Sequence, residues 1–93
     1  MNRVEALSVL HGQLRRWRER PWRQLREEVG QSHRFNVIAE SGTWYQGEVQ
    51  VFWDDKPDGA IRVMASIDDG GWLAIVPLTE DFILAPDGTF VGE

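Results

Sequence analysis

The sequence has 93 residues, 42% hydrophobic and 27% charged, which is typical of one globular domain spanning residues 1–93. It contains no Cys, which excludes disulfide scaffolds, Cys-ligated zinc, iron–sulfur clusters and thiol catalysis. No apolar run approaches the roughly 18 residues of a membrane helix, and the N-terminus lacks an apolar signal segment. We therefore expect a cytoplasmic protein that makes no membrane contact.

The net charge of −5 is unevenly distributed. Residues 1–34 hold eight Arg and four Glu, a balance of +4. Residues 35–93 hold Lys56 and Arg62 against eleven acidic residues, a balance of −9. The overall charge argues against attraction of the whole protein to nucleic acid, although the N-terminal third is basic.

The N-terminal third has the apolar spacing of a helix. The sequence predicts helices over about residues 3–18 and 21–29, separated by a bend at Pro21, since Pro is tolerated at a helix start but not within a helix. Asn2 and Glu5 have the spacing of a capping box at the start of the first helix. The stripe of the first helix consists of Val4, Leu7, Leu10, His11, Leu14 and Trp17, and that of the second helix of Trp22, Leu25 and Val29.

After the second helix, apolar and polar residues alternate with the period of a β-strand. The residues 68–71, Asp-Asp-Gly-Gly, are a strong hairpin signal. Simple pairing of the second and third strands places Phe52 opposite Arg62 and Gln50 opposite Met64. In chain order, the predicted strands span about residues 35–39, 43–53, 60–67 and 72–76, followed by a short hairpin of 82–84 with 89–91.

This order of elements predicts an α+β fold. The N-terminal helix pair (1–30) packs on one face of a curled antiparallel meander (33–93) of four to five strands, because no helix separates the strands. The helices should cover the face that carries Tyr45, Val49, Val51, Ile61, Val63 and Ile67. Three of the five Trp residues, Trp17, Trp22 and Trp53, also fit core positions.

Residues that could carry catalysis are scarce, so we lean towards a non-enzymatic protein with no cofactor and no metal. His11 and His33 show no metal-binding spacing and no acidic partner. The loop that starts at Asp54 resembles a calcium-binding loop, but Lys56 and Ala65 occupy positions where oxygen ligands are required. A ligand pocket or an enzyme site between helix and sheet, using His11 or Tyr45, stays an alternative.

A second alternative is nucleic-acid binding through the Arg-rich and Trp-rich N-terminal segment. Arginines interleaved with Trp17 and Trp22 suit phosphate contacts and base stacking. The simpler interpretation buries both Trp residues and pairs the arginines with the acidic sheet or with a second subunit. The candidate nucleic-acid-binding residues are Arg15, Arg16, Arg18 and Arg23.

The leading hypothesis concerns the face of the sheet that the helices leave open. Large apolar side chains on such a face are typical of protein interfaces. Acidic loops beside them would steer a basic partner. We therefore predict a protein-binding or self-associating domain, in the simplest case a homodimer. The candidate partner-binding residues are Trp44, Phe52, Met64 and Trp72, with Asp54 and Asp55.

Overall fold

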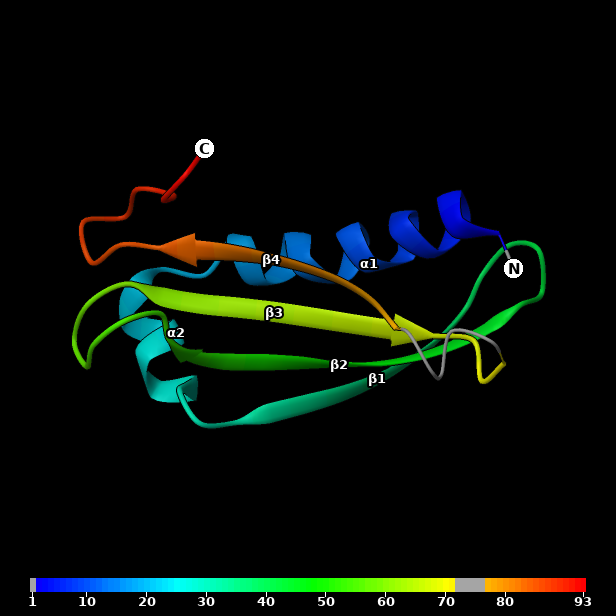
Figure 1. The fold of residues 1–93 in the computed structure, drawn as a ribbon, viewed down its shortest axis with the longest axis horizontal. Helices are drawn as coiled ribbons and strands as arrows, with labels where there is room; N and C mark the ends of the chain where they lie inside the picture. Colours follow the sequence, from blue (N-terminus) through cyan, green and yellow to red (C-terminus); the bar gives the residue numbers. More distant parts are fainter. Residues whose placement is uncertain (1, 72–76) are drawn as a thin grey trace.

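A computed structural model describes residues 2–71 and 77–93 of the chain. It shows an α+β fold. Two helices pack on one face of an open, twisted, four-stranded antiparallel sheet (Figure 1). The strands lie in the order β1-β2-β3-β4, so each strand neighbours the next in the chain. The elements are α1 (Arg3–Arg18), α2 (Trp22–Glu28), β1 (Ser32–Ile38), β2 (Trp44–Trp53), β3 (Ile61–Asp68) and β4 (Leu78–Leu84).

Helix α1 begins and ends as the sequence predicts. The side chain of Asn2 accepts a hydrogen bond from the Glu5 amide at 3.0 Å, which satisfies one of the free N–H groups of the first turn. The carboxylate of Glu5 does not complete a capping box but accepts hydrogen bonds from the Tyr45 hydroxyl at 2.9 Å and from Ser41. It thereby joins the start of the helix to the sheet.

Helix α1 lies over β3 and β4, and α2 lies over β2 and β3 (Figure 1). The predicted hairpin register is confirmed, because Phe52 pairs with Arg62 and Gln50 pairs with Met64. The face predicted to meet the helices is buried at all six positions. Together with the helices it forms a core of Ala6, Leu10, Leu14, Trp17, Leu25, Tyr45, Val49, Val51, Ile61, Val63, Ala65, Ile67, Phe82 and Leu84.

The last part of the sheet differs from the prediction in which strand pairs with β3. The strand that pairs with β3 is Leu78–Leu84, whereas the predicted fourth strand, 72–76, lies outside the described residues. Asp68 and Asp69 do not close a tight hairpin, and each instead accepts a hydrogen bond from the backbone two residues on. The predicted hairpin of 82–84 with 89–91 is present in part, since Leu84 bridges to Phe90 and 82–84 is also the end of β4.

Candidate interaction surfaces

The sheet face turned away from the helices, which we call the outer face, carries the even-numbered residues of β1, β2 and β3. Trp44 is at the start of this face and Phe52 near the end of the same strand, eight residues and about 26 Å further along. Phe52 and Met64 are half-buried, and Trp72 lies outside the described residues. Within the described chain, the predicted apolar residues therefore do not form one continuous patch.

A different apolar group surrounds Trp44. Its cross-strand neighbour on the outer face is Ile38, and the two side chains are 53% and 72% exposed. Ile38 also lines a groove of about 470 Å³ with Val4, which is 78% exposed at the start of α1. We call Val4, Ile38 and Trp44 the apolar end. Of these three, only Trp44 was a predicted contact residue. Val4 was predicted to lie on the apolar stripe of the first helix, but it is exposed because it lies in the first turn, beyond the part of α1 that packs on the sheet.

The acidic residues near the apolar end are Glu40 and Asp68, whereas Asp54 and Asp55 lie elsewhere. Glu40 lines the groove with Val4 and Ile38. Asp68 lies across from Gln46, whose amide donates a hydrogen bond to it at 3.1 Å. These two carboxylates give the apolar end an acidic border.

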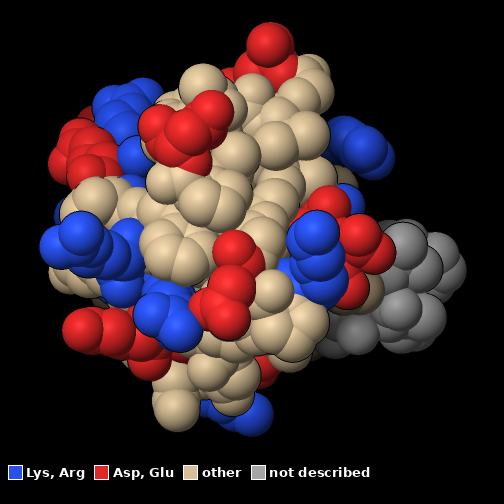
Figure 2. Space-filling view, turned by 90° about the vertical axis from the view of Figure 1, so that its left-hand side faces the viewer, with Lys and Arg blue, Asp and Glu red and all other residues tan. Residues whose placement is uncertain are grey.

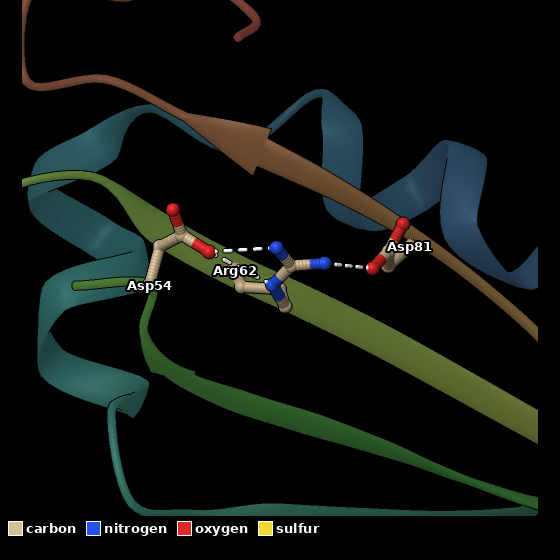
Figure 3. A network of polar contacts seen from close by, with 3 residues as sticks. All are labelled: Asp54, Arg62 and Asp81. Carbon is tan, nitrogen blue, oxygen red and sulfur yellow. Dashed lines mark hydrogen bonds and ion pairs between the residues drawn. The ribbon is translucent and has the colours of Figure 1, made fainter. Parts of the chain in front are cut away.

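Asp54 lies at the far end of the outer face and is engaged by Arg62 (Figure 3). The Arg62 guanidinium donates hydrogen bonds to Asp54 at 2.7 and 2.9 Å and also contacts Asp81 of β4. Hydrogen bonding to these two carboxylates raises the pKa of Arg62 above its ordinary value. The network joins β3 to β4 and to the 54–59 loop. Asp54 therefore has a structural role, whereas Asp55 is exposed.

Two arginines of the N-terminal third, Arg18 and Arg26, form ion pairs with acidic residues from later in the chain. Arg18 pairs with Glu93 at 2.6 Å and lies 4.1 Å over the Phe90 ring. Hydrogen bonding from Arg18 lowers the pKa of Glu93. Arg26 pairs with Asp58 at 2.8 Å. These pairs agree with the interpretation of the arginines as a rim that the acidic part of the chain neutralises.

The Trp residues of this segment are poor stacking platforms. Trp17 is 7% exposed and lies in the core, with the Arg20 guanidinium 3.8 Å from its ring centre. Trp22 is half-buried, and its indole N–H donates to the Gly59 carbonyl at 2.9 Å. Trp53 is also half-buried, with its ring centre 6.2 Å from that of Trp22. The structure thus removes the base-stacking argument for Trp17 and weakens it for Trp22.

A cleft of about 400 Å³ lies between the helix bend and the C-terminal turn. Three arginines line it, Arg18, Arg20 and Arg23, together with the acidic residues Glu19 and Asp87. Figure 2 views the molecule from this end and shows uncharged surface between groups of basic and acidic side chains. The two signs of charge and the pairing of Arg18 with Glu93 leave the cleft without a clear preference for one kind of ligand.

The polar groups predicted for a helix–sheet pocket are not placed for that role. Tyr45 is fully buried. His11 is exposed and lies 3.5 Å from Glu80, on the surface beside β4. His33 has an acidic partner that the sequence did not reveal, since its Nε2 atom lies 2.8 Å from a Glu28 carboxylate oxygen. The centre of its ring lies 5.0 Å from that of Trp17, and the two rings are tilted relative to each other. Each histidine therefore lies next to an acidic side chain of the fold.

Tyr45 should titrate abnormally. Burial, with the hydrogen bond to Glu5 and the charge of that carboxylate, raises its pKa to about 12. The unfolded chain ionises near 10, so this group's contribution to the free energy of unfolding is intact below pH 10 and is lost as the pH rises to 12. Because the chain has a single Tyr, tyrosinate absorbance against pH measures this directly. A midpoint near 10 in the folded protein would show that the hydroxyl is solvated.

Among residues 2–71 and 77–93, no three His, Asp or Glu side chains gather in a way that would hold a metal ion. None of the helices described is both long and apolar enough to cross a membrane. Comparisons with protein-family models, with curated proteins and with solved structures found no match to this chain.

Proposed function

We propose that the chain is a small non-enzymatic protein-binding domain, and that its contact surface is the apolar end. The observation that carries this proposal is the Ile38–Trp44 pair, two large apolar side chains that lie side by side and are each more than half exposed. Both helices cover the opposite face of the sheet. Adjacent exposed apolar side chains of this size are typical of sites that a second protein covers.

The surroundings of the pair support the same proposal. Asn36 and Gln46 form the next cross-strand pair on the outer face, so amide groups border the apolar residues as they do at the rim of protein interfaces. Glu40 and Asp68 add negative charge that would steer a basic surface on the partner. A homodimer is the simplest partner, and a cytoplasmic location is part of the proposal.

The proposal is tested by removing the apolar side chains one at a time. Ile38→Ser and Trp44→Ala should each reduce the binding of a hydrophobic fluorescent dye. Trp44→Ala should also weaken association with a partner by about 2 kcal/mol, roughly 30-fold in Kd. Val91→Ser is the matched control, because Val91 is also exposed but lies in the C-terminal segment.

Light scattering over a concentration series accompanies the dye measurement. The proposal would be wrong if the wild type stays monomeric and the dye binds equally to the wild type, Ile38→Ser and Trp44→Ala. Equal loss of dye binding in Val91→Ser would show that the effect is not specific to the apolar end.

Nucleic-acid binding has weaker support. Arg15, Arg16 and Arg23 are exposed, but Trp17 is buried. A complex held by these arginines would weaken steeply as salt rises, because its affinity would come from counterion release. Absence of any complex with RNA or DNA at low salt would exclude this alternative.

A further inference from the structure

Strand β1 is an open edge of the sheet. It pairs with β2 on one side, and no described strand pairs with its other side (Figure 1). At one end of this pairing Ala39 donates its amide hydrogen to Thr43, and at the other Val51 donates to Gln31. Because hydrogen-bonded pairs alternate along an antiparallel ladder, the odd-numbered residues of β1 bond to β2. The backbone N–H and C=O groups of Arg34, Asn36 and Ile38 therefore point away from the sheet.

The inner face of β1 is incompletely covered as well. On β3 the side chains that face the helices are fully buried, from Ile61 to Ile67. The corresponding apolar side chains of β1, Phe35 and Val37, are only half-buried, because α1 lies over β3 and β4 and α2 over β2 and β3. A further strand beside β1 would cover both side chains.

The opposite edge of the sheet is better protected. On β4, the carbonyl of Ile83 accepts a hydrogen bond from the Val91 amide at 2.9 Å, and Leu84 bridges to Phe90. Glu80 and Asp81 also place charge on that strand, a common device against edge pairing. Between Arg34 and Ile38, strand β1 has no Pro and a single charge, that of Arg34.

We propose that β1 pairs antiparallel with β1 of a second copy of this chain, about a two-fold axis at Asn36, so that the two sheets become continuous. This pairing rests on the proposed function and identifies the bound partner as a second copy of the chain. The axis pairs Asn36 with Asn36 of the second copy, Arg34 with Ile38, and Phe35 with Val37.

The side chains match on both faces of this arrangement. On the inner face, Phe35 and Val37 cover each other across the axis. On the outer face, the guanidinium of Arg34 reaches Ile38 of the second copy and the Trp44 ring beside it, a cation–π contact that covers part of the apolar end. An axis at Arg34 would instead oppose two guanidinium groups, which disfavours that register.

Charge substitution at Asn36 tests the register, because this exposed side chain would meet its own copy at the axis. The wild type should change from monomer to dimer between about 1 μM and about 1 mM in light scattering, the range of transient associations. Asn36→Lys and Asn36→Asp should each raise the dissociation constant about fivefold or more, and their equimolar mixture should restore dimers. Gln24→Lys, an exposed amide changed on α2, is the control and should dimerise like the wild type.

Three outcomes would overturn the pairing: a wild type that is monomeric throughout, dimers unaffected by either change at Asn36, or a dimer that Asn36→Asp strengthens. The last would place Asn36 opposite Arg34 and shift the axis. Failure of the pairing is distinguishable from failure of the proposed function. If the wild type is monomeric but dye binding still depends on Ile38 and Trp44, β1 pairing is wrong and the apolar end stays a contact surface.

Discussion

Replacing Leu10 by Ala should lower the free energy of unfolding by about 2–5 kcal/mol, the range for removing a large aliphatic side chain from a core. Leu10 is fully buried on α1, in the core cluster that joins this helix to β3 and β4. The substitution removes apolar contacts and leaves a cavity that neighbouring side chains fill only in part. Urea denaturation followed by Trp fluorescence gives the change directly.

Ser8→Ala is the control for this experiment, since Ser8 is exposed on the same helix. It should change the free energy of unfolding by less than about 0.5 kcal/mol. A loss in unfolding free energy below about 1 kcal/mol for Leu10→Ala would contradict the packing of α1 against the sheet, because truncating a fully buried Leu side chain costs more than that.

Gly47→Val should destabilise the protein by about 2–3 kcal/mol through overpacking of a central strand. Gly47 pairs with Phe35 on β1, and a Cβ atom at this position would lie well inside 3.0 Å of the Phe35 ring and of the Ser66 carbonyl oxygen. The ring can move, but the carbonyl belongs to the backbone of β3. In a domain of this size, the loss corresponds to a fall in Tm of roughly 10–20 °C.

Gly12→Ala should have the opposite effect on stability when its thermal unfolding is measured in the same way. Gly12 lies within α1, where an added methyl group would meet no atom within 4 Å. Because Ala restricts the unfolded chain and favours helix, this change should stabilise the protein by about 0.5–1 kcal/mol. Equal effects at the two glycines would show that crowding at Gly47 is not the cause.

The helices and the central hairpin could be predicted closely because local signals determine them. Asn2 caps α1, and Pro21 separates α1 from α2, which is slightly shorter than predicted. The loop between β2 and β3 is rich in turn-forming residues. The alternation of inward-facing and outward-facing side chains in the two strands fixes their register, in which Phe52 pairs with Arg62.

The last strand could not be predicted by the same reasoning. Residues 72–76 are apolar throughout and have the composition of a strand, whereas β4 contains Thr79, Glu80 and Asp81. Pairing with β3 requires only that Phe82 and Leu84 reach the core, since the remaining side chains of an edge strand can face water. Strand β4 therefore lacks the continuous apolar pattern on which the sequence prediction of the fourth strand depended.

The sequence pattern predicts which side chains of β2 and β3 lie on the outer face, but not which apolar side chains lie close together there. Alternation assigned Trp44 and Phe52 to the same side, and their eight-residue separation already placed them far apart along β2. Ile38 is not predicted as a contact residue, because the apolar alternation of the first strand, 35–39, runs through its odd-numbered positions, which lie on the other face. Its position beside Trp44 follows from the register of β1 against β2, which the sequence alone does not provide.

An NMR dilution series of the labelled protein tests most directly whether the apolar end is a contact surface in solution. We expect the amide signals of Asn36, Ile38 and Trp44 to shift together with concentration and to return on dilution. Those of Gly12 and Val91 should stay fixed. Signals at the apolar end that do not depend on concentration, or shifts confined to the helix bend, would contradict the account of this surface as the site where a second copy binds.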